Sequence, residues 1–219
     1  MRYKCLILDH DDTVVNSTAT IHYPSFIEYL KFAKPELVEC YTLESFIDKN
    51  FNPGIFSLLK DEVGLTDEQM EEEQGFWEDF VNNKYPTAYQ GLAEILHRFK
   101  ESGGIIAVAS HSMQRFIERD YENNRLPVPD VIYGWDLPRE KRKPFPYAVF
   151  DVMERFGLSR NEILMVDDLK PGYDMARAAG IDFAAAGWGY DAPQIESFMR
   201  NHSDFYLKTV SELSELVFD

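Results

Sequence analysis

The distribution of apolar and polar residues predicts a sheet with helices between its strands over most of the chain. At the start of the chain and again beyond about residue 87, short apolar runs stand apart from stretches with helical spacing. The apolar runs predict buried strands at residues 6–8, 105–109, 131–133, 163–166 and 183–186. Strands that alternate with helices form parallel sheets covered on both faces. We therefore expect an α/β core with a Rossmann-like, doubly wound parallel sheet.

Helical periodicity fills the segments between these strands. Helices are predicted over residues 92–100, 147–156 and 175–179, with another after Ser110 and a terminal one at 213–217. Gly180 directly follows one of them, as is common where a helix ends.

Residues 18–86 contain no convincing strand pattern. Apolar residues recur there near helical spacing, and Thr66 with Gln69 has the form of a capping box at a helix start. We predict two domains: residues 1–17 and 87–219 form the α/β core, and residues 18–86 form an inserted α-helical domain.

Composition narrows the class of protein. The 219 residues carry a net charge of −16, which repels nucleic acid and anionic membranes but does not exclude a small anionic ligand. Cys5 and Cys40 lie far apart without metal-site spacing, so neither a disulfide framework nor structural zinc is expected. No apolar run approaches the length of a membrane span. We expect a cytoplasmic protein, a monomer or weak homodimer.

Polar residues follow three of the predicted strands. Asp9 and Asp11 come directly after the first, and alternation along a strand would place both on one side and His10 on the other. Ligands of such sheets bind beyond the carboxyl ends of the strands, where Ser110 and Asp167-Asp168 also fall. Four carboxylates gathered at one edge need a compensating cation. Oxygen ligands favour a hard ion, and we predict Mg²⁺.

Four segments in order resemble the motifs of the haloacid dehalogenase-type (HAD) phosphohydrolases. They span most of the chain outside residues 18–86. The segments are Asp9-His10-Asp11-Asp12-Thr13, Ser110, Lys143-Pro144-Phe145-Pro146-Tyr147, and Asp167-Asp168 with Gly172. Gly187-Trp188-Gly189-Tyr190 is similar to a loop of the phosphoglycolate-phosphatase and β-phosphoglucomutase-like branch. In that branch an insertion at residues 18–86 would be a helical cap of the C1 type, which closes over the site and selects the substrate.

The resemblance implies a Mg²⁺-dependent phosphatase acting on a small phosphorylated metabolite. Asp9 would be the nucleophile that forms an aspartyl phosphate, and Asp11 the general acid and base. Ser110 and Lys143 would complete the catalytic set and bind the phosphate. Backbone amides of Asp11, Asp12 and His111 would add hydrogen bonds to the phosphate.

The family also implies a ligand set for the metal. It consists of the Asp9 side chain, the backbone carbonyl of Asp11, and Asp168, while Asp167 would ligate directly or through water. Asp12 stands where the family more often has glycine, which removes no catalytic group. In the predicted cap, Lys49 and Asn50 are candidate substrate contacts.

Other functions fit the same residues less well. A phosphomutase on this scaffold would keep the phosphoryl group on Asp9 until substrate returned. A phospho-accepting regulatory or binding protein is also possible, but receiver domains are shorter and carry their acidic pair before the phosphoacceptor. A calcium loop is disfavoured because the segment from Asp9 lacks the required glycine and glutamate. A true dehalogenase would lack the carboxylate of Asp11.

Overall fold

The chain divides into two compact units. The structure is a computed structural model that describes residues 1–218. One unit consists of Met1–Asn16 with Thr87–Asp219, and the other of Ser17–Pro86. The assignment of the inserted part as a cap domain stays a prediction.

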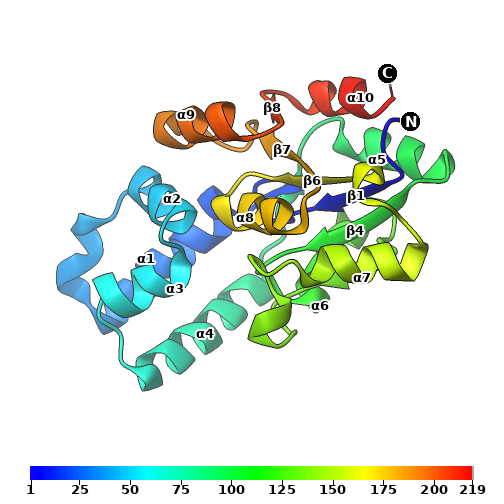
Figure 1. Cartoon of the computed structure of the whole chain (residues 1–219). Coiled ribbons are helices and arrows are strands. Elements are labelled where there is room, and N and C mark those ends of the chain that lie inside the picture. The colour runs from blue at the N-terminus through cyan, green and yellow to red at the C-terminus, as the bar shows by residue number, and fades with distance from the viewer. Residues whose placement is uncertain (219) are drawn as a thin grey trace. The chain divides into compact units, whose positions relative to one another are not determined.

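The first unit is built on a six-stranded sheet in which every neighbouring pair of strands is parallel. The chain enters at the centre of the sheet, extends to one edge, and then crosses to the other side (Figure 1). This arrangement confirms the predicted doubly wound fold. The strands in spatial order are β5 (Val131–Tyr133), β4 (Ile105–Ala109), β1 (Cys5–Leu8), β6 (Ile163–Asp167), β7 (Asp182–Ala186) and β8 (Phe205–Leu207).

Helices connect these strands, with one more helix after β8. They are α5 (Leu92–Glu101), α6 (Gln114–Asn123), α7 (Tyr147–Phe156), α8 (Lys170–Ala179), α9 (Pro193–His202) and α10 (Val210–Phe218). Helix α8 begins earlier than predicted, because Pro171 lies in its first turn, where proline is compatible with a helix. Helix α9 was not predicted. Its buried residues are Ile195 and Met199 alone, too sparse a stripe to recognise.

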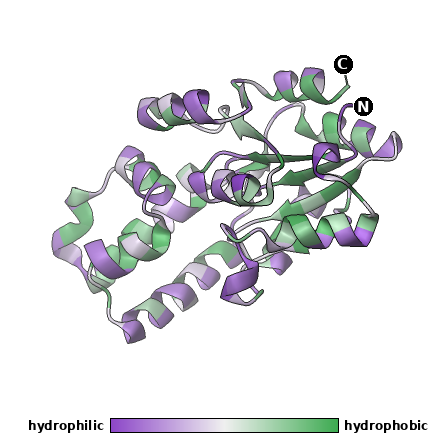
Figure 2. Ribbon diagram, viewed as in Figure 1, coloured by the Kyte–Doolittle hydropathy of each residue, from purple (hydrophilic) through white to green (hydrophobic). Residues whose placement is uncertain are grey.

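Alternation along β1 divides its side chains between the two faces of the sheet. Leu6 and Leu8 are buried in a cluster shared with α5, α6 and α10. Ile7 is also buried and, by alternation along the strand, points to the opposite face. Figure 2 shows the strands as the most apolar part of this unit. Full burial of each large aliphatic side chain contributes about 1.5–3 kcal/mol, which fixes the strand ends that carry the polar residues.

A two-stranded antiparallel ribbon stands at the ends of the first unit's two segments. It pairs β2 (Val15–Asn16) with β3 (Thr87–Ala88). The sequence did not predict this ribbon, because two-residue strands leave no periodic pattern. As a result, the chain leaves the first unit at Asn16 and returns at Thr87, directly beside the point of departure.

The second unit is helical throughout its regular structure, as predicted. Its core gathers aromatic and aliphatic residues, among them Phe26, Tyr29 and Leu58. The capping box of Thr66 and Gln69 is present in both directions. The elements are η1 (Thr18–His22), α1 (Tyr23–Ala33), η2 (Pro35–Cys40), α2 (Leu43–Phe51), α3 (Ile55–Ser57), η3 (Leu58–Glu62) and α4 (Asp67–Asn82). Within residues 1–218, no helix combines the length and the apolar character needed to cross a membrane.

Candidate active site

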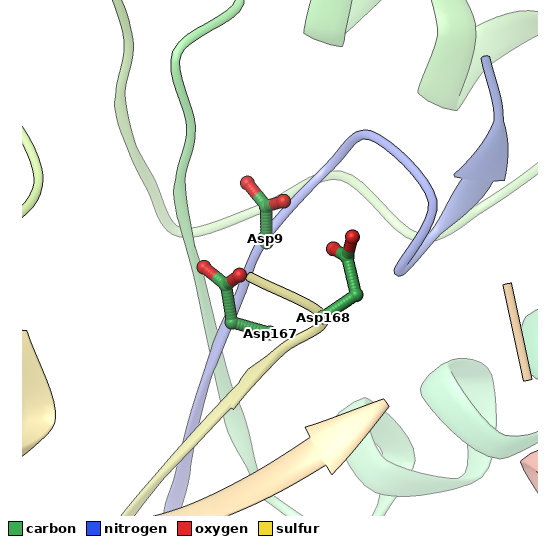
Figure 3. A group of neighbouring side chains, drawn as sticks. All are labelled: Asp9, Asp167 and Asp168. Atoms are coloured by element: carbon green, nitrogen blue, oxygen red, sulfur yellow. The ribbon is translucent and has the colours of Figure 1, made fainter. Parts of the chain in front are cut away.

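The register of the sheet brings the predicted polar residues to one edge. Leu8, the last residue of β1, pairs with Val108 on one side and Val166 on the other. The amide of Asp9 then donates to the carbonyl of Val166 at 2.9 Å. Figure 3 shows Asp9 beside Asp167 and Asp168, with the three carboxylates on the same side of the strand ends.

Lys143 lies between two of these carboxylates. Its Nζ atom donates to Asp9 Oδ1 at 2.7 Å and to Asp167 Oδ2 at 2.6 Å, with all three side chains buried. Burial lowers the pKa of Lys143, but the charges of Asp167 and Asp9 outweigh burial and hold the pKa above its usual value. Lys143 therefore remains an ammonium at neutral pH.

Asp167 is fully buried at the end of β6 and held on two sides. Its Oδ1 atom accepts from the amide of Leu169 at 2.7 Å, while Oδ2 accepts from Lys143. A Cβ atom at Gly172 would lie 2.1 Å from Asp167 Oδ2, so α8 can approach only with glycine at this position. Burial, followed by the charge of Asp9, raises the pKa of Asp167.

Asp168 is fixed by two hydroxyl groups. Thr13 donates to its Oδ1 atom at 2.9 Å, and Tyr190 donates to its Oδ2 atom at 2.9 Å. Burial and then the neighbouring Asp167 raise the pKa of Asp168 well above the usual value. The hydrogen bonds set the orientation of this carboxylate without supplying a full positive charge.

The donor set fits a hard divalent cation. One oxygen from each of Asp9, Asp167 and Asp168 lies within 4.8 Å of the others. Three carboxylates beside the ammonium of Lys143 leave an excess of negative charge, which is consistent with the raised pKa values of Asp167 and Asp168. Oxygen-only ligands with this charge suit Mg²⁺. These are the side chains that could hold the predicted metal.

Asp11 has different partners from Asp9. Its Oδ2 atom accepts from Ser112 at 2.7 Å and from Ser110 at 3.4 Å. The strand expected to carry both carboxylates ends at Leu8, and the chain turns through Asp12, whose φ of 54° is the left-handed conformation that favours glycine. The backbone thus turns away from strand geometry between the two aspartates.

Ser112 was not found by sequence reasoning. It is buried and holds Asp11, and its amide donates to Ser110 Oγ at 3.0 Å. The only signal in the sequence was its position two residues beyond the strand-end serine.

Two residues predicted to bind the phosphate through their backbone amides make hydrogen bonds within the unit, His111 through its ring and Asp12 through the amide itself. The His111 ring donates through Nε2 to the carbonyl of Lys143 at 3.1 Å. Burial and then Lys143 lower the pKa of His111 to about 4, so the imidazole is neutral at pH 7. The amide of Asp12 donates to the carbonyl of Val15 at 2.7 Å, so this amide is already engaged within the loop.

The loop after β7 borders the same site. Trp188 Nε1 donates to the carbonyl of Thr13 at 3.1 Å, and the hydroxyl of Tyr89 donates to the carbonyl of Gly189 at 3.3 Å. With the bond from Tyr190 to Asp168, these contacts tie the loop to both the first and the fourth motif. In the sequence, the only indication that this loop belongs to the site was its resemblance to a loop of one branch of the family.

The chain is similar to known proteins of the family predicted from these motifs. The sequence model of the haloacid dehalogenase-like hydrolases matches residues 6–186. A phosphoglycolate phosphatase of Mannheimia succiniciproducens is 26% identical over 231 residues, covering 99% of each chain. One from Aliivibrio fischeri is 29% identical over 104 residues, which cover 47% of this chain and 45% of that protein. The match to the latter therefore spans about half of its length. The predicted family and its phosphoglycolate-phosphatase-like branch are confirmed.

Solved structures agree on the fold. A Bacteroides fragilis protein named as a haloacid dehalogenase-like hydrolase superposes with a TM-score of 0.80 at 21% identity, over 96% of this chain and 99% of that one. A haloacid dehalogenase-like family hydrolase of Streptococcus pneumoniae gives 0.75 at 16% identity, over 98% of both chains.

Proposed function

Because the chain belongs to the haloacid dehalogenase-like hydrolases, we propose that it is a Mg²⁺-dependent phosphatase. It hydrolyses a small phosphomonoester through an aspartyl phosphate on Asp9. The observation that carries the proposal is the buried carboxylate of Asp9 bound by Lys143 beside Asp167 and Asp168. A structural ion pair would need one acid, whereas this cluster holds more negative charge than its lysine can balance.

Asp9 is the nucleophile. A carboxylate needs no base to remove a proton before it attacks, unlike a serine hydroxyl. An oxygen of Asp9 forms a bond to phosphorus as the bond from phosphorus to the ester oxygen breaks. Lys143 lies 2.7 Å from the carboxylate, where it screens repulsion between Asp9 and the anionic phosphate.

Asp11 transfers the protons. As an acid it protonates the leaving ester oxygen. As a base it then removes a proton from the water that attacks phosphorus of the aspartyl phosphate, which frees Asp9 and releases inorganic phosphate. Ser112 and Ser110 hold the Asp11 carboxylate through one oxygen, Oδ2. This grip orients the carboxylate for both transfers.

Asp9, Asp167 and Asp168 would hold the Mg²⁺ ion, with the backbone carbonyl of Asp11 as a further ligand. When bound, the ion supplies positive charge that offsets the charge of the phosphate and of the transition state. Thr13 and Tyr190 keep Asp168 in position, and Lys143 keeps Asp167 in position.

The substrate is a small phosphorylated metabolite, and phosphoglycolate is the first candidate because the relatives carry that name. The inserted unit, Ser17–Pro86, acts as the cap that selects it. Within that unit Lys49 pairs with Glu62 at 2.6 Å, and the side chain of Asn50 donates to the carbonyl of Phe46. A substrate contact by either residue would compete with these bonds. A cytoplasmic location is also part of the proposal, in keeping with two free cysteines, Cys5 buried and Cys40 exposed.

The test is phosphate release from a panel of phosphomonoesters, including phosphoglycolate, sugar phosphates and 4-nitrophenyl phosphate, with Mg²⁺ or with EDTA. We expect release only with Mg²⁺, and a loss of at least about a thousandfold in Asp9→Asn. Asp174→Asn is the matched control, since Asp174 forms a surface ion pair with Lys170 on α8. Release in EDTA, or release that survives Asp9→Asn, contradicts the mechanism. Transfer between sugar phosphates with little free phosphate would instead identify a mutase.

A second measurement isolates the role of Asp11. Because hydrolysis of the aspartyl phosphate needs a base, Asp11→Asn should slow this step and let the phosphoenzyme accumulate. Rapid-quench labelling with radioactive substrate measures the phosphoenzyme directly. Wild-type rates of formation and decay in Asp11→Asn would exclude this role.

A further inference from the structure

His10, the residue between the two catalytic aspartates, is buried and hydrogen-bonded on the opposite side of the loop. Only 1% of its surface is exposed, and its Nε2 atom lies 3.2 Å from Asp120 Oδ2 in α6. Its ring stacks on that of Tyr121, with centroids 6.0 Å apart. The sequence predicted only that His10 lies on the other side of the strand from Asp9 and Asp11. The contact spans 110 positions and follows no local pattern.

Asp120 is held in turn by its neighbour in α6. It is 3% exposed, and its Oδ1 atom accepts a hydrogen bond from Arg119 Nε at 2.8 Å and lies 2.8 Å from Arg119 Nη2 in an ion pair. A carboxylate paired in this way can only accept, so the His10 nitrogen that faces it carries the proton. The order of donation is therefore from Arg119 and from His10 into Asp120.

The backbone of His10 anchors the other side of the loop. Its carbonyl accepts from the amide of Val14 at 2.9 Å and from the amide of Val15 at 3.1 Å. Residue 10 thus closes the turn that contains Asp11 and Asp12, while its side chain attaches this turn to α6. Movement of His10 would move both neighbouring aspartates.

The segment from Ser112 to Asp120 contacts the Asp9–Asp11 loop at two points. Ser112, just before α6, donates to Asp11 at 2.7 Å, and Asp120, within α6, binds His10. An apolar side chain at position 10 could fill the same buried space, but apolar contacts are non-directional. A hydrogen bond to a fixed carboxylate sets both the position and the orientation of the loop.

We propose that His10 and Asp120 form a positioning pair that holds the Asp9–Asp11 loop against α6, so that the Asp9 carboxylate meets the substrate phosphorus in line. The inference rests on the proposed function, because it assigns the pair to the attack by Asp9. Neither residue touches the substrate. A displacement of the nucleophile by about 1 Å lowers the rate about a hundredfold.

The experiment compares His10→Leu, Asp120→Leu and the double variant for kcat, KM and free energy of unfolding, with 4-nitrophenyl phosphate and saturating Mg²⁺. His10→Leu removes one of the two partners of buried Asp120, and Asp120→Leu leaves the buried ring of His10 without its acceptor, so each variant should be destabilised. The double variant no longer buries that ring and should regain stability relative to Asp120→Leu. If the pair positions Asp9, kcat should fall about 10- to 100-fold in all three variants, including the double variant. KM should change by less than about threefold, because ground-state binding is retained.

A purely structural role predicts a different outcome, in which kcat recovers together with stability in the double variant. That recovery, or a wild-type kcat in folded His10→Leu, would overturn the proposal. His10→Gln retains an N–H donor that can reach Asp120 and should restore most of kcat. If His10→Leu does not fold, His10→Gln serves as the test instead. A folded Gln variant that keeps the hydrogen bond to Asp120 but loses as much kcat as the double variant would count against the pair.

Two controls separate this inference from the proposed function. Tyr3→Phe removes the hydroxyl that donates to Asp182 at 2.6 Å, at the opposite end of β1 from Asp9, and should lower stability without lowering kcat. Wild type and Asp9→Asn are assayed in the same series. If Asp9→Asn retains activity, the proposed function fails. If Asp9→Asn is inactive while the three Leu variants keep kcat, only the positioning pair fails.

Discussion

Replacing Lys143 with methionine should destabilise the metal-free protein more than any other single loss of a cation in the first unit's described residues. The side chain of Lys143 is 4% exposed, and its Nζ atom contacts Asp9 and Asp167 at 2.7 and 2.6 Å. Methionine fills similar space but leaves these acids and Asp168 without a counter-charge. Breaking a buried pair by removing one partner costs about 3–5 kcal/mol.

Urea unfolding in EDTA, followed by the fluorescence of Trp135 and Trp188 in the first unit, measures this loss. Lys141→Met is the matched control, because Lys141 lies two residues away with its Nζ atom 4.6 Å from the ring centre of Tyr147. We expect the control to lose less than about 1 kcal/mol. A loss in Lys143→Met no greater than in the control would refute the reasoning.

Two further arms test the electrostatic cause. Adding Asp167→Asn to Lys143→Met removes one of the uncompensated charges and should restore part of the lost stability. The loss of stability in Lys143→Met relative to wild type should also become smaller as the pH falls, because protons neutralise the remaining carboxylates. A deficit independent of pH and of Asp167 would indicate lost packing rather than lost charge.

Three other predictions concern the same site. Ser112→Ala removes the shorter hydrogen bond to Asp11 and should lower kcat about tenfold with little change in KM, measured by steady-state kinetics; an unchanged kcat would contradict a role in orienting Asp11. Tyr190→Phe frees an oxygen of Asp168 and should weaken Mg²⁺ binding about 10- to 100-fold by calorimetry, whereas equal affinity would mean that the hydroxyl does not orient the ligand. Because the folded pKa values of Asp167 and Asp168 are raised, the stability they contribute without metal is present below their unfolded pKa near 3.8 and is lost as the pH rises through the folded values. Thermal unfolding should therefore show stabilisation by Mg²⁺ that grows between about pH 5 and about pH 8, and a constant difference would contradict it.

The sequence predicted the parts of the site that follow strands. Asp9, Ser110 and Asp167 stand directly after apolar runs, and parallel strands deliver their carboxyl ends to one edge. Lys143 could be identified only through its Lys-Pro-x-Pro context, since no strand precedes it. The fold followed from the same runs, except where an element was too short or too polar to show a period, as in the β2–β3 ribbon and α9.

The partners of the site residues could not be predicted, because long-range contacts leave no local pattern. Ser112 lies 101 positions from Asp11, and Asp120 lies 110 positions from His10. Both partners come from the segment after β4, where a serine and a helical acid are ordinary residues. The packing of α6 on the sheet brings them to the loop that carries Asp9 and Asp11.

Asp9 and Asp11 have different hydrogen-bond partners, and this difference has a chemical consequence. Asp9, the proposed nucleophile, is bound by the ammonium of Lys143, which can only donate and stabilises negative charge on this carboxylate. Asp11 is bound by the hydroxyls of Ser112 and Ser110, and a hydroxyl can donate to a carboxylate or accept from a carboxylic acid. The partners of Asp11 can therefore stabilise this residue both as a carboxylate and as a carboxylic acid. A group that first gives a proton and later takes one needs such partners. Two acids of the same kind, two residues apart, thus have environments suited to different tasks.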